Sequence, residues 1–197
     1  MNYTQSEIQD IKSRLRDYCR TNSKYLPLVV FDLVTEGMSI KEILSVRVSN
    51  VDDTPRIELG DKNIPVSRST YDDILEYLSN TMEIKVLRNL TKSDGMRLAD
   101  LGRSVGLDNP GAWSGLYYNY LKRLMKHGVV EKIENSYYIL NDVEDYIDSL
   151  YLTRLRPDKK STKESLRGNF KIALRETNTD KDLTPTFFKR IYLSLPS

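Results

Sequence analysis

Residues 113–140 read WSGLYYNYLKRLMKHGVVEKIENSYYIL, a stretch in which an amphipathic helix is followed at once by a short hairpin. Tyr117, Leu121 and Leu124 recur at spacings of four and three residues, which predicts one apolar helical face. Gly128 comes directly after two residues that can carry positive charge, an arrangement that the helix dipole and a left-handed C-terminal cap both favour. The helix is therefore expected to end at Gly128, where the hairpin begins.

Two β-branched and aromatic runs follow the glycine, at residues 129–133 and 137–140. Glu134, Asn135 and Ser136 separate these runs, and such residues tolerate the backbone angles of a turn. A β-hairpin is therefore predicted directly after the helix. The helix side opposite the apolar face is polar and basic, which suits a DNA major groove; it comprises Ser114, Tyr118, Asn119, Lys122 and Lys126.

The surrounding segment, residues 82–152, is predicted to fold in the order helix, helix, helix, strand, strand, helix. Its helices are expected at 82–90, 97–105, 111–127 and 143–152. This order resembles that of winged helix-turn-helix regulators, and KRLMKHGVVEK is similar to the end of their recognition helix and their first wing strand. The resemblance implies that the third helix enters the major groove while the hairpin, or wing, lies along the backbone or the minor groove.

The same resemblance nominates particular DNA contacts. The residues expected to face bases are Ser114, Tyr118, Asn119 and Lys122, and Asn119 has the amide that can bond bidentately to adenine. Lys122, Arg123 and Lys126 are expected to meet phosphates or guanine. The candidates on the wing are Lys132, Asn135 and Ser136, although Glu131 and Glu134 make it less basic than a strong backbone binder requires.

The composition limits the classes of protein to which the chain can belong. Its 197 residues, 39% of them hydrophobic, can form two small domains, but no apolar run approaches the roughly 18 residues of a membrane span. The N-terminal sequence mixes charged and apolar residues instead of presenting a signal-peptide core, so a cytoplasmic, nucleoid-associated protein is expected. One cysteine and one histidine cannot build a zinc finger, a disulfide framework or a histidine-based triad. We expect no cofactor, metal, membrane partner or small-molecule substrate.

The net charge of +2 is unevenly distributed along the chain. Residues 1–82 carry 10 basic and 13 acidic residues and residues 83–152 carry 9 and 10, whereas residues 153–197 carry 11 and 5. Phosphate binding depends on local charge, so a basic C-terminal segment is compatible with nucleic-acid binding, as it is with a solvated tail. Beside a winged helix, the basic residues of this segment are interpreted as DNA contacts: Arg154, Arg156, Lys159, Lys160 and Lys163.

Three parts are predicted along the chain. Residues 1–80 form a module with helices at 5–20, at 25–34 and from Ile40, then two or three short antiparallel strands within 47–66 and a helix over 69–78. Residues 81–152 form the helix-and-hairpin domain. Residues 153–197 form a basic extension whose first dozen residues should be flexible, with a helix at 166–175 and a final helix after Thr184.

The N-terminal part resembles a known family. Residues 36–52, EGMSIKEILSVRVSNVD, resemble the catalytic domain of the tyrosine recombinase (phage integrase) family, which carries a pattern like TGLRISELLSLRWSDID. Residues 57–78, IELGDKNIPVSRSTYDDILEYL, are similar to the hairpin, proline-containing strand and helix that follow in that family. The resemblance covers roughly residues 25–78 and implies half of such a catalytic domain.

The catalytic residues of that family are not matched. Ser39 stands where the family has its first catalytic arginine, and serine has neither the charge nor the bidentate fork that clamps a phosphate. Lys62 lies near the position of the catalytic lysine, but no His-x-x-Arg motif follows, and Tyr192 lacks the surroundings of the nucleophile. The loss of one charge-stabilising donor costs on the order of a hundred-fold in rate. We therefore expect a non-catalytic module.

Taken as a whole, the sequence predicts an α+β, mainly helical protein that binds double-stranded DNA without catalysis, as a transcriptional regulator or a chromosome or mobile-element architectural factor. A homodimer is expected, because the last helix of many winged-helix regulators extends to pair two copies on a palindromic site. Two alternatives stay open. One is a protein-docking adaptor with an aromatic face formed by Tyr117, Tyr118 and Tyr120. The other is a divergent recombinase or nuclease that uses Lys62, Arg47 or Arg68, with Tyr192 as nucleophile.

Overall fold

The chain folds into two compact units, each of mixed α+β and mainly helical structure. The computed structural model describes residues 4–51, 54–141, 143–177 and 179. Unit 1 comprises residues 1–77 and residues from 149 onward, whereas unit 2 comprises residues 78–148. Unit 2 is thus inserted into the sequence of unit 1. Within the described ranges, no helix combines the length and the apolar character needed to cross a bilayer.

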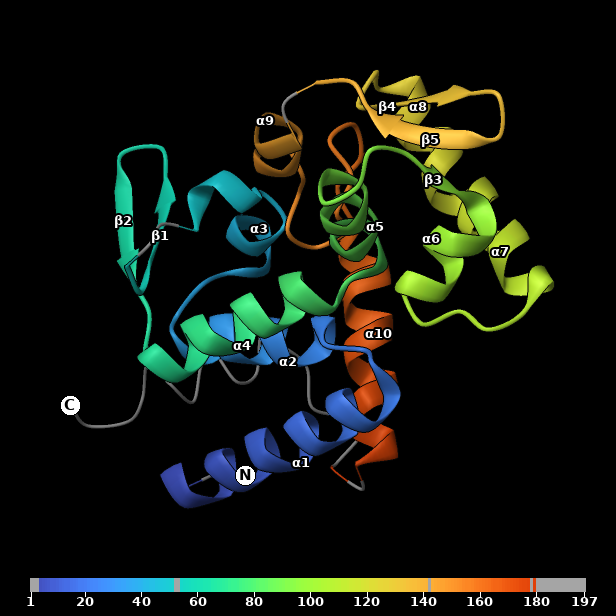
Figure 1. Ribbon diagram of the computed structural model, residues 1–197. Helices are drawn as coiled ribbons and strands as arrows, with labels where there is room; N and C mark the ends of the chain where they lie inside the picture. The colour runs from blue at the N-terminus through green and yellow to red at the C-terminus, as the bar shows by residue number, and fades with distance from the viewer. Residues whose placement is uncertain (1–3, 52–53, 142, 178, 180–197) are drawn as a thin grey trace. The chain divides into compact units, whose positions relative to one another are not determined.

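Three helices open unit 1 (Figure 1). Helix α1, Gln5–Asn22, begins with a capping box between Thr4 and Glu7. Helix α2, Leu26–Thr35, has Pro27 in its first turn, where a missing amide costs no hydrogen bond, and the chain then turns at Gly37 with a φ of 91°. Helix α3, Ile40–Ile43, starts with the predicted Ser39–Glu42 capping box but makes only a single turn.

The remaining elements of unit 1 come from both sides of the insertion. After a 3₁₀ turn, η1 at Val48–Asn50, strands β1 (Arg56–Leu59) and β2 (Lys62–Pro65) form an antiparallel hairpin, which confirms the predicted strands. Helix α4 spans Arg68–Asn80, of which the last three residues are assigned to unit 2, and α10 spans Lys163–Glu176 beyond the insertion. Figure 1 shows α10 crossing α1 and α2.

The segment predicted as a separate basic extension is part of unit 1 as far as the structure describes it. Its helix α10 buries Leu166, Phe170, Ala173 and Leu174 and stacks Phe170 on Phe31 of α2 at 6.3 Å between ring centroids. The stretch expected to be flexible also contains buried residues, among them Leu155 and Ser161. The helix predicted at 166–175 is thus present as α10, and its apolar residues form a packed face within a basic segment. The final helix predicted after Thr184 lies outside the described residues.

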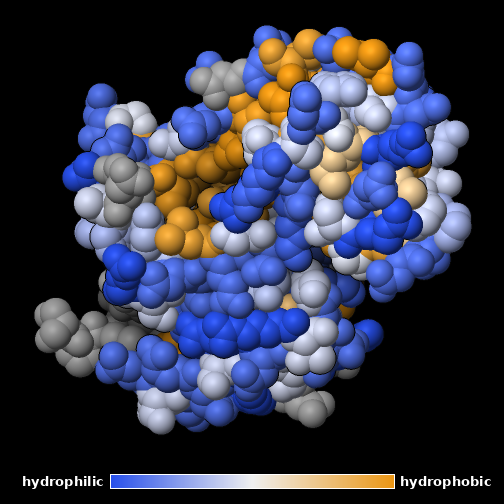
Figure 2. Space-filling model, viewed as in Figure 1, coloured by the Kyte–Doolittle hydropathy of each residue, from blue (hydrophilic) through white to orange (hydrophobic). Residues whose placement is uncertain are grey.

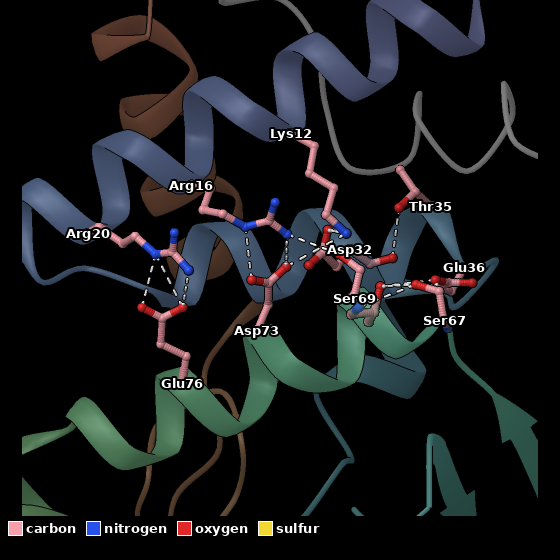
Figure 3. Close-up of polar contacts among 11 residues, drawn as sticks. Lys12, Arg16, Arg20, Asp32, Thr35, Glu36, Ser67, Ser69, Asp73 and Glu76 are labelled. Atoms are coloured by element: carbon pink, nitrogen blue, oxygen red, sulfur yellow. Dashed lines mark hydrogen bonds and ion pairs between the residues drawn. The ribbon is translucent and has the colours of Figure 1, made fainter.

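A cluster of buried charges joins α1, α2 and α4 (Figure 3). Lys12 Nζ lies 2.8 Å from Oδ1 of Asp32, whose side chain is fully buried, and 3.7 Å from Asp73. Arg16 donates two hydrogen bonds to the Asp73 carboxylate, one from Nε at 3.1 Å and one from Nη2. Burial raises the pKa of Asp32 in spite of the ammonium of Lys12. Burial, the largest single cause, acts to raise the pKa of Asp73, but Arg16, Asp32 and Lys12 together hold that pKa below its usual value.

The return from the insertion is fastened within unit 1. Val48 N–H donates to Leu150 O and Leu152 N–H donates to Val46 O, both at 2.9 Å. Tyr77, which precedes the insertion, donates its hydroxyl to Leu152 O at 2.9 Å in a buried site. The two ends of the insertion are therefore held near each other by unit 1 itself.

Unit 2 has helices around a small antiparallel sheet. Its elements, in chain order, are α5 (Met82–Thr91), β3 (Met96–Arg97), α6 (Leu98–Ser104), α7 (Pro110–Leu116), the π-helical turn η2 (Tyr117–Leu121), α8 (Lys122–Lys126), β4 (Val130–Ile133), β5 (Ser136–Ile139) and α9 (Val143–Asp148). The sheet order is β3-β5-β4. Its core includes Leu87, Leu101 and Leu124.

Two features of unit 2 differ from the prediction. Strand β3 has only two residues, too few for an alternating pattern, so sequence periodicity gave no sign of it. The last helix was predicted to reach Leu152, but α9 ends at Asp148 because the next residues pair with unit 1 at the Arg47–Tyr151 bridge. The apolar residues Leu150 and Leu152 belong to the core of unit 1 and not to a long helix.

Candidate nucleic-acid interface

The helical segment 110–126 of unit 2 carries most of the candidate interface. Asn109 caps it by accepting a hydrogen bond from Ala112 N–H, and Pro110 occupies the first position. The Trp113 indole donates to Leu107 O at 2.7 Å, in the loop that follows α6, and its ring packs close to α6. Gly102 of α6 permits this approach, since a Cβ there would lie only 2.2 Å from Trp113 Cδ1. The segment is therefore held at a defined distance from α6.

A π-helical turn at Tyr117–Leu121 sets which residues of this segment face the core. Leu116, Leu121 and Leu124 are buried, with a spacing of five residues across the turn and three after it. The prediction that Tyr117 belongs to the buried face is corrected: Tyr117 is half-buried, and Leu116 takes the core position. A five-residue step does not fit an α-helical stripe, and one inserted π turn accommodates it.

The outward face of the segment is polar and accessible. Each of Ser114, Tyr118, Asn119, Lys122 and Lys126 is exposed, as predicted, and Tyr118 reaches 66% exposure. Tyr118 packs edge-on against Tyr117, with 5.0 Å between ring centroids, so its ring is supported on one side. The face thus presents an amide, a hydroxyl, an aromatic ring and two ammonium groups, which together can bond base edges and phosphates.

Arg123 does not belong to this face. Its guanidinium donates to the Glu83 carboxylate and to Asn119 O, and only 16% of its side chain is exposed. Glu83 is buried on α5 and also accepts a 2.8 Å hydrogen bond from Tyr146 of α9. Its charge compensates a buried carboxylate inside unit 2, so the structure gives no support to the predicted DNA contact of Arg123. A lone glutamate among the apolar residues of 82–90 was the signal for this cluster.

The predicted wing is a short hairpin with a two-residue turn, in which Ile133 pairs with Ser136. Glu134 has a φ of 52°, a left-handed conformation that glutamate rarely adopts. Lys132 and Asn135 are exposed. Ser136 was predicted to lie in the turn, but it belongs to β5 and is half-buried. Ile133 is 50% exposed beside this turn, which makes the hairpin partly apolar.

The basic residues predicted in the C-terminal segment lie in unit 1 and not in unit 2. Arg154 and Arg156 are half-buried, and the carbonyl of Arg156 accepts a hydrogen bond from Tyr151 N–H. Lys159, Lys160 and Lys163 are exposed, and Lys163 is the first residue of α10. These residues therefore lie on unit 1, in the stretch that was expected to be flexible.

The residues that the recombinase resemblance singled out have structural partners. Ser39 uses its hydroxyl in the capping box of α3. Hydrogen bonds from Ser39 are the largest cause that lowers the pKa of Glu42 to about 2. Lys62, whose Nζ lies 3.0 Å from the Glu42 carboxylate, lowers it further. Arg47 donates to Ser149 O and to Tyr151, whose ring lies 4.2 Å away. Tyr192 lies outside the described residues.

Among the described residues, no group of three or more His, Cys, Asp or Glu side chains is arranged to hold a metal ion. Comparisons with protein families, characterised proteins and solved structures found no match.

Proposed function

We propose that the chain is a DNA-binding protein that reads duplex DNA with the 110–126 segment of unit 2 and acts by binding without covalent chemistry. The proposal rests on one observation above all. An exposed polar face, from Ser114 to Lys126, lies on the third helix of a helix-strand-helix-helix-hairpin order. That is the order of a winged helix, in which the third helix enters the major groove.

Strand β3 supports this interpretation. Winged-helix domains complete their hairpin with a short strand placed between the first two helices, and β3 pairs with β5 at Met96–Tyr137 and Arg97–Ser136. The hairpin then follows the third helix within four residues, since α8 ends at Lys126 and β4 begins at Val130. In this proposal the exposed Lys132 and Asn135 are the wing contacts.

The chemistry of the exposed face suggests which residues contact bases and which contact the DNA backbone. Asn119 offers one donor and one acceptor in the plane that adenine matches, so we assign it to base recognition. Lys122 and Lys126 are one helical turn apart and carry the charge that phosphates attract. Tyr118 adds an aromatic surface with a hydroxyl at its edge, which suits a sugar or a thymine methyl group.

The test is a comparison of two variants of the full chain on a duplex enriched from a random library. Asn119→Ala with Lys122→Ala should lose about 1–3 kcal/mol of discrimination between that duplex and a scrambled one. Lys92→Ala is the matched control for charge, because Lys92 is exposed at the end of α5. Binding by fluorescence anisotropy over a range of KCl concentrations measures both. Equal discrimination in the double variant and the wild type would refute the proposal.

A second candidate function is favoured by the exposed apolar side chains of the hairpin. Ile133 and Leu140 are 50% and 48% exposed, and Figure 2 shows an apolar patch over β4 and β5. Exposed apolar patches on small domains often bind proteins. In this candidate the chain is a docking adaptor, and Ile133→Ser with Leu140→Ser would abolish partner binding that is insensitive to salt. Under the DNA proposal the same variant keeps its affinity for the duplex.

A further inference from the structure

Helix α10 is fixed on unit 1 by its apolar side and at its C-terminal end, and its N-terminus is capped. Leu166, Phe170, Ala173 and Leu174 are all at most 1% exposed where α10 packs on α1 and α2. Thr162 caps the N-terminus by accepting a hydrogen bond from Ser165 N–H. Near the C-terminus, Arg14 of α1 donates to Thr177 O at 3.1 Å. The helix is therefore presented as a rigid element and not as a loose tail.

Beside this packed face, α10 carries a row of cations that we name the α10 stripe: Lys163, Arg167, Lys171 and Arg175. These residues are all exposed and recur at four-residue steps. At about 1.5 Å of rise per residue, neighbouring cations are roughly 6 Å apart along the axis and the stripe is about 18 Å long. Lys159 and Lys160 are exposed just before the helix and extend the same charge.

The α10 stripe differs from most other arginines of unit 1 in having few acidic partners. Elsewhere in the unit, most arginines lie within 4.0 Å of a carboxylate, as Arg16 does with Asp73, Arg20 with Glu76 and Arg68 with Asp72. On α10 only Arg175 has such a partner, Glu176, among the described residues. The stripe thus keeps its charge available to an external anion.

We propose that the α10 stripe is a second nucleic-acid site, which binds the phosphate backbone of a duplex without regard to sequence. Duplex DNA carries one negative charge per roughly 1.7 Å of axis, so a rigid 18 Å row of cations meets several phosphates at once. Lysine and arginine side chains on a fixed helix lose less conformational freedom on binding than the same residues in a tail. This inference takes DNA as the ligand from the proposed function but places the site on unit 1.

The packing of α10 argues against an anionic membrane as the ligand. A helix that binds a bilayer surface inserts its apolar face into the lipid. The apolar face of α10 is already covered by α1 and α2, and Ile172, at 51%, is its only large hydrophobic residue that is exposed within the described part. Attraction to lipid would therefore be limited to charge, whereas a duplex offers a denser line of phosphates.

The test measures the affinity of the full chain for a duplex of random sequence against KCl concentration. Arg167→Gln with Lys171→Gln should reduce the slope of log affinity against log salt by roughly 0.9 for each lost phosphate contact, about 1.8 in all. Lys24→Gln with Lys41→Gln removes the same charge from exposed positions elsewhere on unit 1 and should leave the slope nearly unchanged. Glu164→Gln removes an exposed carboxylate from α10 and should raise the affinity.

The outcomes separate this inference from the proposed function. Loss of slope in the α10 variant, with unchanged discrimination by the Asn119 and Lys122 variant, would support the stripe and refute base reading by unit 2. Equal slopes in the α10 variant and its control would overturn the stripe, as would tighter binding to vesicles containing phosphatidylserine than to the duplex. If circular dichroism shows that the double variant is misfolded, Glu164→Gln decides between the outcomes. A gain in duplex affinity would support the stripe, and no gain would refute it.

Discussion

At the scale of single residues, the pairing of Arg123 with Glu83 makes Arg123 a stability determinant of unit 2. Glu83 is 2% exposed, so removing the guanidinium leaves a buried carboxylate without its cation. We expect Arg123→Ala to lower the free energy of unfolding by about 3–5 kcal/mol. Lys126→Ala, on the exposed side of the same helix, should change it by less than about 0.5 kcal/mol. Urea denaturation followed by tryptophan fluorescence measures both, because Trp113 lies in unit 2.

A rescue separates this explanation from a general intolerance of change at Arg123. Replacing both partners with apolar residues of similar size, Arg123→Met with Glu83→Leu, removes the unpaired charge and should recover much of the lost stability. No recovery would show that Arg123 stabilises unit 2 by other contacts. A loss of DNA binding in Arg123→Ala alone would then reflect unfolding and not a lost phosphate contact.

Asp32 gives unit 1 a pH dependence of definite sign. Burial raises its pKa in the folded state above the unfolded value of about 4. The stability that this group contributes is therefore complete below about pH 4 and is lost as the pH rises through the folded pKa. Asp32→Asn, which stays neutral, should unfold at a less pH-dependent temperature than the wild type above pH 5. Asp17→Asn, at an exposed position of α1, is the control and should keep the wild-type trend.

At the scale of secondary-structure elements, the sequence predicted those whose signals are local. The Ser39–Glu42 capping box, the glycine that ends α8 and the strands of both hairpins depend on neighbouring residues and are observed. The length of α9 depends on residues far along the chain and was predicted wrongly, whereas the helix predicted at 166–175 is observed as α10. Prediction of the candidate interface from sequence has the same limit. The exposure of Lys122 follows from helix periodicity, whereas the pairing of Arg123 with Glu83 depends on the position of Glu83 in the fold.

The turn of the β4–β5 hairpin offers a test at this scale. A non-glycine residue in the left-handed region costs about 1–2 kcal/mol, and asparagine adopts it more readily than glutamate does. Glu134→Asn should therefore stabilise unit 2 by about 0.5–1 kcal/mol. It also removes a negative charge from the proposed wing, so DNA affinity should rise. Glu131→Gln makes the same charge change within β4 and separates the two effects, because it should raise affinity without raising the melting temperature.

At the scale of the whole molecule, unit 2 is inserted into the sequence of unit 1. The chain therefore passes from one unit to the other at two points, Tyr77–Leu78 and Asp148–Ser149. The ends of unit 1 are held together by its own hydrogen bonds, which include those of Tyr77 and Val48. The exposed carboxylates Glu144 and Asp145 lie in the first turn of α9, where they interact favourably with the helix dipole. Helix α4, Arg68–Asn80, continues across the first of these two points by three residues.

From this arrangement we expect both units to fold alone. Residues 78–148 expressed separately, and unit 1 with those residues replaced by a short Gly/Ser linker, should each unfold cooperatively and show dispersed amide resonances. The 78–148 fragment should retain preference for the enriched duplex, whereas unit 1 should bind duplexes of any sequence through the α10 stripe. Collapse of unit 1 after excision, with the linker lengthened to exclude strain, would show instead that its core depends on unit 2. Preference for the enriched duplex in unit 1 alone would place base recognition in the wrong unit.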